Sequence, residues 1–256
     1  MAQRSTGSAT ISFGLVAIPV KLYLTASEDR VSFKMIAPKT KNRVNQKIVD
    51  SVTGEEVNRG ECLSGYEYKK NSIVVFTDEE LATMGAPADK KDSIEIDQFV
   101  PNELSPLRVE KSYFIGPQKG ADKAYTLLRM LLNKSNKMAV GKWYARGKEH
   151  LVAITPHEDG LLVHQMYYNT EMRSFDNTCA KLQVTDAELA MGLQLVNHLS
   201  KPVFDVSEYH DGFVQSVAAA AETKINGGTL ALDDKPATAP STDLMAALQA
   251  SLSKAS

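Results

Sequence analysis

The chain has 256 residues, of which 43% are hydrophobic and 23% charged, a composition typical of a globular protein. Its formal net charge is −2. Taken alone, this value argues against a nucleic-acid-binding protein, because such proteins often carry an excess of basic residues. No apolar run reaches the roughly 18 residues of a membrane-spanning helix, and the N-terminus lacks the apolar core of a signal peptide. Cys62 and Cys179 lie far apart and outside any Cys/His cluster, so we expect no disulfide scaffold, no metal site and a cytoplasmic protein without a membrane partner.

The first two-thirds of the chain is predicted to be mostly β-strand. Residues 10–23 are rich in Ile, Val, Phe and Leu, which is typical of one strand buried on both faces. Pro19 within them predicts an edge or a bulge, because proline cannot donate to a ladder. Residues 46–57 indicate a hairpin that turns at a Thr-Gly pair, and residues 66–76 indicate two short strands or one bent strand.

A capping box opens the next group of elements. Thr77 with Glu80 predicts a short helix over the residues that follow. Further elements are then expected in this order: a strand at 93–100, a helix at about 120–134, a hairpin at 137–156 and a strand at 160–168. The helix is identified by apolar residues at a helical period, namely Ala124, Leu127, Leu128, Leu131 and Leu132.

After residue 184 the pattern changes from strands to helices. Thr185 and Glu188 form a second capping box before an amphipathic helix, and residues 207–225 indicate another. Residues 226–243 are rich in Gly, Pro, Ala and Thr and predict a flexible linker. A last short helix would place Leu244, Met245, Leu248 and Leu252 on one face, and at this length it would need a partner to be stable.

Charge is segregated along the chain in spite of the balanced total. Residues 107–150 contain ten basic and three acidic residues, whereas residues 78–104 contain eight acidic residues and two lysines. The basic segment, with a second basic run at 39–43, could follow a phosphate backbone. The alternative is an ordinary solvated surface. No aromatic ladder alternates with these cations, so stacking on single strands is not indicated.

Known catalytic signatures are not found in the sequence. It contains no phosphate-binding GxxxxGK[ST] loop, no GxGxxG, no GxSxG and no HExxH. None of the five histidines has another at a metal-ligand spacing. We therefore expect no enzyme, no metal and no cofactor.

Several motifs in fixed order resemble one family, bacterial-type Ku of non-homologous end joining. They are "TISFGLVAIPVKLYLTASED" near the N-terminus, "GEEVNRGECLSGYEYKKNSIVVFTDEEL", "IEIDQFVPNELSPLRVEKSYFIGPQKGADKAYTLLRMLL" and "WYARGKEHLVAITPHEDGLLVHQMYY". The resemblance covers roughly residues 8 to 225. It implies a mostly β fold with α-helices: a Ku-type β-barrel core with arm insertions, which forms a ring as a homodimer, followed by C-terminal helices.

The resemblance also implies a function. Ku binds ends of double-stranded DNA without sequence preference, by threading them through the ring, and recruits an end-joining ligase of the ligase-D type. It has no enzymatic activity and acts in the cytoplasm at the nucleoid. On this basis we expect a barrel core with its arm at 1–184, a dimerising helical arm at 185–225, and a linker with a short amphipathic tail at 226–256.

Candidate residues follow from the charge pattern and the resemblance together. Arg146 is the strongest candidate for DNA contact, because it lies at a hairpin tip that matches a ring-lining position of the family. The full DNA-binding set is Lys39, Lys41, Arg43, Lys47, Lys119, Lys142, Arg146 and Lys148. The dimer interface is expected at Leu193, Val196, Leu199, Phe213 and Val217, and ligase docking at Leu244, Met245, Leu248 and Leu252.

Two other classes of function stay open at this point. A β-barrel that serves only as a protein-interaction scaffold would have no DNA affinity. A nuclease would need clustered acids to hold metal ions, and the sequence shows no such cluster.

Overall fold

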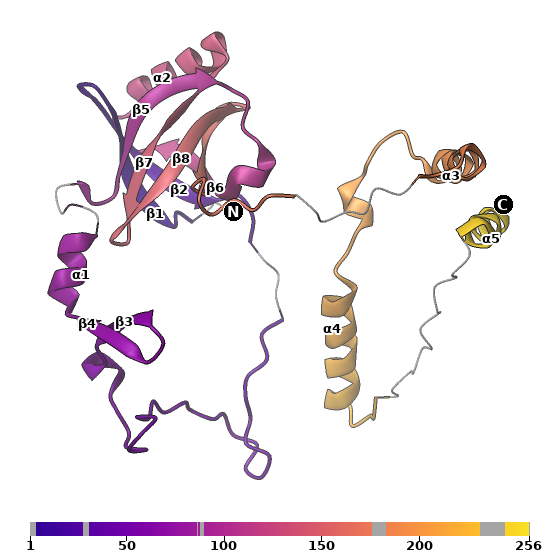
Figure 1. Cartoon of the computed structure of the whole chain (residues 1–256), viewed down its shortest axis with the longest axis horizontal. Helices are drawn as coiled ribbons and strands as arrows, with labels where there is room; N and C mark the ends of the chain where they lie inside the picture. Colours follow the sequence, from indigo (N-terminus) through magenta and orange to yellow (C-terminus); the bar gives the residue numbers. More distant parts are fainter. Residues whose placement is uncertain are drawn as a thin grey trace. The chain divides into compact units, whose positions relative to one another are not determined.

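The computed structural model describes residues 4–27, 31–85, 87, 90–175, 183–230 and 244–255 (Figure 1). The chain divides into two compact units. The first comprises residues 1–28 and 34–173 and contains the barrel and its insertion, and the second comprises residues 29–33 and 174–256 and contains the C-terminal helices.

Seven strands of the described residues close into a barrel in the order β1-β2-β6-β9-β8-β7-β5. Their bounds are β1 (Gly7–Phe13), β2 (Val16–Leu24), β5 (Ser93–Pro101), β6 (Val109–Pro117), β7 (Lys137–Ala145), β8 (Lys148–His157) and β9 (Gly160–Met166). Neighbouring strands are antiparallel except for β1 and β5, which are parallel. The expected β-barrel fold class is confirmed.

Residues 10–23 form parts of two strands, so the prediction of one strand is wrong. β1 and β2 make a hairpin around Gly14, whose φ of 57° is the left-handed conformation that glycine adopts readily. The apolar run hid this turn, because both strands of the hairpin contribute residues to the core. Pro19 pairs with Thr10 of β1 and lies just outside the ladder to β6, which begins at Val20; on that side its carbonyl accepts from the backbone N–H of Gln118 at 3.0 Å.

Alternating residues of the strands fill the barrel. Ile11, Ile18 and Ile94 are fully buried, and so are side chains from β7, β8 and β9. At one point two strands approach very closely: a Cβ on Gly141 of β7 would lie 1.9 Å from the carbonyl oxygen of Glu95 on β5. Glycine is required there because the backbone of β5 occupies the space of a side chain.

Helix α2 (Asp122–Ser135) packs on β7 and β8. Tyr125 anchors it, because its hydroxyl donates to the carbonyl of Ile115 at 2.7 Å and accepts from the backbone N–H of Leu161 at 3.0 Å. Of the apolar residues that identified the helix, Leu128 and Leu132 are buried, whereas Leu127 and Leu131 are half exposed.

Between β2 and β5 the chain carries an insertion, defined here as residues 34–85 (Figure 1). It contains the 3₁₀ turn η1 (Arg59–Glu61), the strands β3 (Ser64–Lys69) and β4 (Ser72–Phe76), and helix α1 (Asp78–Met84). The predicted capping box of Thr77 and Glu80 is present, and residues 66–76 form two strands rather than one. The hairpin predicted at 46–57 is reduced to a single bridge between Val49 and Glu56.

Most other elements lie where the sequence predicts them, but β6 was not predicted, and the helix expected at 207–225 begins only at Gly212. The 3₁₀ turn η3 (Pro106–Arg108) precedes β6. The second unit contains α3 (Asp186–Leu199), η4 (Val206–Glu208), α4 (Gly212–Ile225) and α5 (Leu244–Ala255). The capping box of Thr185 and Glu188 opens α3 as predicted. Most of the predicted linker, at 231–243, lies outside the described residues.

Candidate nucleic-acid interface

The tip of the β7–β8 hairpin presents two of the predicted DNA-binding residues. Arg146 and Gly147 form the turn with φ values of 51° and 73°, the positive pair typical of a type I′ hairpin turn. Arg146 and Lys148 are exposed, and within the described chain neither forms an ion pair. The end of α1 packs closely against the tip. A Cβ added to Gly85 would lie 2.5 Å from the carbonyl oxygen of Gly147, so only glycine fits at residue 85.

Lys142 lies on the same hairpin but is already paired. Its Nζ lies 3.1 Å from Glu149 on β8. The hydrogen bond with Glu149 raises the pKa of Lys142, and the same bond lowers the pKa of Glu149. A phosphate would have to compete with this carboxylate, so Lys142 is a weaker candidate than Arg146 or Lys148.

The insertion presents the second group of cations. A turn after the bridge residue Ile36 carries Lys39 and Lys41, and Arg43 closes it by pairing with Ile36. These three cations are exposed and form no ion pair among the described residues. Lys47 differs, because its Nζ lies 2.6 Å from Glu56.

Lys119 does not join the hairpin group. It follows β6, whose last residue Pro117 pairs with Val20, beside the end of the barrel that carries the β1–β2 turn. The register of β5 with β7 places the β7–β8 tip at the other end, where Ser93 pairs with Tyr144. Lys119 and Arg146 therefore lie at opposite ends of the barrel.

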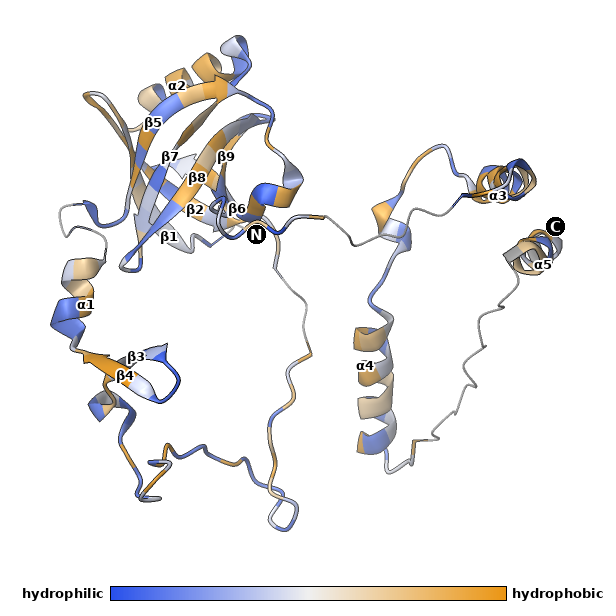
Figure 2. Ribbon diagram, in the orientation of Figure 1, coloured by the Kyte–Doolittle hydropathy of each residue, from blue (hydrophilic) through white to orange (hydrophobic). Residues whose placement is uncertain are grey.

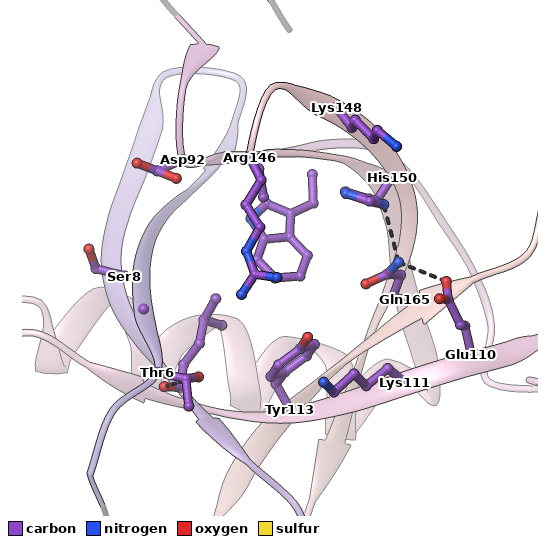
Figure 3. Close-up of a pocket in the computed structure, with 14 residues that line it drawn as sticks. Thr6, Ser8, Asp92, Glu110, Lys111, Tyr113, Arg146, Lys148, His150 and Gln165 are labelled. Atoms are coloured by element: carbon purple, nitrogen blue, oxygen red, sulfur yellow. Dashed lines mark hydrogen bonds between the residues drawn. The ribbon is translucent and has the colours of Figure 1, made fainter. Parts of the chain in front are cut away.

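A cavity opens at the barrel end that carries the hairpin tip. Figure 3 shows Arg146 extending from the tip over the cavity, with Tyr113 and Lys111 on the opposite side. The sequence analysis did not identify Lys111 as a residue of this end of the barrel. The available signal was its spacing of two from Tyr113, which places both on one face of β6.

The predicted dimer residues lie on exposed helix faces of the second unit. Leu193, Val196 and Leu199 are exposed on α3, and Phe213 is exposed on α4 while Val217 is half-buried. The half-buried residues of α3 form another stripe, Glu188, Met191, Gly192 and Leu195. The face predicted for dimerisation is thus not the face that α3 buries within its own unit.

The predicted ligase-docking residues belong to α5, which contacts α3. Met245, Leu248 and Leu252 are half-buried, and the side chain of Leu244 lies outside the described residues. The tail helix therefore has a partner within its own unit. A ligase that docks on these residues would have to replace or extend that contact.

An apolar surface of the insertion was missed by sequence reasoning. Ile73, Val74 and Val75 of β4 are consecutive, so they point to both faces of the hairpin, and all three are exposed. Figure 2 shows β4 at the hydrophobic end of the scale. Tyr66 and Tyr68 of β3 are also exposed. The available signal was an apolar run in a strand with no other strand predicted to cover it.

The arrangement nearest to a catalytic pair is structural. Ser112 Oγ lies 2.8 Å from Nδ1 of His164, but Nε2 of the same ring lies 2.9 Å from Thr155 Oγ1. Hydroxyls occupy both ring nitrogens, and burial lowers the pKa of His164. The imidazole therefore joins three strands as a neutral hydrogen-bonding group.

Among the described residues, no group of three His, Cys, Asp or Glu side chains is placed to hold a metal ion. No helix in the described part of the chain is long and apolar enough to cross a membrane.

Comparison with known proteins decides the family. The family model for the Ku70/Ku80 β-barrel domain matches residues 12–191. The chain belongs to the Ku family. It is 34% identical to the non-homologous end joining protein Ku of Lachnoclostridium phytofermentans, over 96% of this chain and 95% of the relative. It is also 34% identical to the protein of that name from Archaeoglobus fulgidus, over 90% of this chain and 92% of the relative.

A third Ku relative, from Paraburkholderia phymatum, is 35% identical over 98% of this chain and 83% of its own length. These alignments extend beyond the barrel into the C-terminal helices, so the family assignment covers both units. The sequence-based recognition of Ku is confirmed.

Proposed function

We propose that this Ku-family protein binds ends of double-stranded DNA without sequence preference and acts in non-homologous end joining. The observation that carries the proposal is the set of unpaired cations on two exposed turns, Arg146 with Lys148 at the hairpin tip and the basic run 39–43 in the insertion. Lysine and arginine on exposed turns are suited to phosphates, which every DNA sequence offers in the same geometry.

The proposed binding surface reads the backbone rather than the bases. Arg146 lies in a two-residue turn, Lys148 is the first residue of β8, and the run 39–43 lies in a turn of the insertion, so both groups present a few charges at a tip rather than a row of side chains along a groove. Lys119, Lys142 and Lys47 are secondary contacts in this proposal. The first lies at the other barrel end, and the other two are paired with glutamates.

A closed ring requires a second copy of the chain. An isolated two-stranded hairpin is only marginally stable in water. The exposed apolar side chains of β3 and β4 are therefore suited to packing against a partner. We assign this hairpin to the homodimer interface, together with the exposed faces of α3 and α4 that carry Leu193 and Phe213. The family assignment supports a homodimer as the partner rather than an unrelated protein.

After end binding, a ligase must reach the DNA end. The protein performs no chemistry itself, and it brings a ligase-D-type ligase to the end through α5. The half-buried apolar residues of α5 are suited to helix-in-groove docking of modest affinity. This work would be done in the cytoplasm, at the nucleoid.

The test uses a linear duplex with biotin at both ends. The protein is added first, streptavidin is then added to block the ends, and dissociation is followed after a chase with unlabelled duplex. A threaded ring stays on the blocked DNA and leaves the open DNA. Equal dissociation from both would contradict threading, and absence of binding to either would favour the scaffold function.

A further inference from the structure

The cavity at the hairpin end of the barrel has the size of a small-molecule site. Its volume is about 620 Å³, within the roughly 300–1,000 Å³ of ligand pockets. Its wall comes from six strands of the barrel, every one except β5, and from Thr6, Asp92 and Arg146 beside them. The DNA-binding proposal gives this space no role.

The cavity lining carries one more positive than negative side chain. Lys111, Arg146 and Lys148 line the cavity, against Asp92 and Glu110. No ion pair within the described chain neutralises the three cations, although Lys111 lies over the ring of Tyr113, 5.4 Å from its centre. Figure 3 shows the guanidinium of Arg146 over the middle of the opening. A ligand with negative charge is therefore favoured.

One wall is fixed by hydrogen bonds. Gln165 Nε2 donates to Glu110 at 2.7 Å and to Nδ1 of His150 at 3.1 Å, and Figure 3 shows this chain along the cavity. Because an amide NH₂ only donates, Nδ1 accepts and the proton of the neutral ring is on Nε2. The cavity thus contains fixed donors and acceptors beside its cations.

A buried donor in the same lining has no partner. Trp143 is 8% exposed, and its indole N–H makes no hydrogen bond among the described residues. An unsatisfied buried N–H costs about 1–3 kcal/mol, and such groups are uncommon in folded proteins. The ring packs edge-on against Tyr113 with centres 5.5 Å apart, so the floor of the cavity is aromatic. A ligand with acceptor atoms and a flat ring fits this floor.

We propose that the cavity binds a nucleoside monophosphate. Arg146 and Lys148 hold the phosphate, and the nucleoside lies toward Tyr113 and the polar wall. Inorganic phosphate alone would leave most of the volume and the aromatic floor unused. An apolar ligand would bury the charged lining unpaired, and the three cations outnumber the two carboxylates that could attract a metal ion.

The same phosphate chemistry has two sources. One is a free nucleotide, and the other is the 5′-terminal nucleotide of a DNA strand, which rests on the proposed end binding. Trp143 is the only tryptophan of the chain, so its fluorescence reports on the cavity directly. The probes are dAMP, deoxyadenosine, and one blunt duplex prepared with 5′-phosphate or with 5′-hydroxyl ends.

The variants are Arg146→Asn and Lys111→Gln, with Lys123→Gln as the control because Lys123 is an exposed cation of α2 outside the cavity. We expect dAMP to change the fluorescence saturably and deoxyadenosine to bind more weakly. Arg146→Asn should weaken dAMP binding by about tenfold, as expected for loss of one charge-assisted hydrogen bond, and Lys111→Gln should weaken it less, because it removes a positive charge from the lining without removing a phosphate contact. The control should bind dAMP as the unmodified protein does.

The outcomes separate the sources. A response to dAMP supports the free nucleotide. A response only to the 5′-phosphorylated duplex supports the DNA terminus. The proposal is overturned if dAMP and the phosphorylated duplex have no effect, if deoxyadenosine or the hydroxyl duplex does equally well, or if the cavity variants bind like the control. A gel shift of the same duplex, run separately, shows whether end binding itself has failed.

Discussion

Arg146 offers a substitution that removes charge while suiting the backbone. Its φ of 51° is followed by a φ of 73° at Gly147. Asn-Gly is the preferred pair for such a turn, so Arg146→Asn should leave the hairpin as stable as before or slightly more stable. Any loss of DNA affinity then reports on the guanidinium and not on folding.

The size of that loss follows from counterion release. One phosphate contact in each protomer of a homodimer is two contacts per ring, so the slope of log affinity against log salt should become shallower by about 1.8. Over a fourfold rise in salt, the unmodified protein should therefore lose roughly tenfold more affinity than the variant does. At about 0.1 M salt the variant should bind roughly 60-fold more weakly.

The assay is fluorescence anisotropy of a labelled duplex at four or more salt concentrations, with Lys123→Gln as a charge-matched control. Thermal melting of both variants confirms the fold. If Arg146→Asn keeps the slope of the unmodified protein, Arg146 makes no phosphate contact and the hairpin tip is not part of the DNA surface. If the control shifts the slope equally, the effect is one of net charge alone.

Four further results are expected. Gly141→Ala should lower the melting temperature by roughly 6–12 °C, because its Cβ would overlap the β5 backbone, and an unchanged melting curve would contradict the close strand approach. Burial lowers the pKa of His164, so the unfolded state takes up a proton at higher pH than the folded state does, and the free energy of unfolding should fall as pH drops below about 6.5. Urea titrations should show a flatter pH dependence of this free energy for His164→Gln than for the unmodified protein. The same pH dependence in both proteins would contradict this role of His164. Ile73→Asp should shift the protein toward monomer in sedimentation velocity, whereas an unaltered dimer would remove β4 from the interface. Deletion of residues 240–256 should leave end binding intact and weaken ligase stimulation, and undiminished ligation would refute docking through α5.

Much of the fold could be predicted because local signals agreed with the final structure. The two capping boxes, at Thr77 and Thr185, open helices as their spacing requires. The β1–β2 turn could not be recognised, since both of its strands are apolar and only Gly14 marks the reversal. The sequence also could not show which side of α2 is exposed, because leucines lie on both its buried and its exposed side.

The candidate site could be predicted only in part. Local sequence placed Arg146 and Lys148 on a hairpin tip, since a turn is a short-range feature. The ion pair of Lys142 with Glu149 depends on the register between two strands, which sequence spacing does not specify. The separation of Lys119 from Arg146 depends on the whole barrel, and so does the cavity that collects Lys111, Arg146 and Asp92.

The central claim is that DNA enters this protein by its ends through phosphate contacts. A gel shift that compares linear duplex with closed circular duplex of the same sequence, at two salt concentrations, tests it most directly. The account predicts binding to the linear form alone, weakened by the higher salt. Equal binding to both forms would contradict threading and would indicate an open basic groove instead.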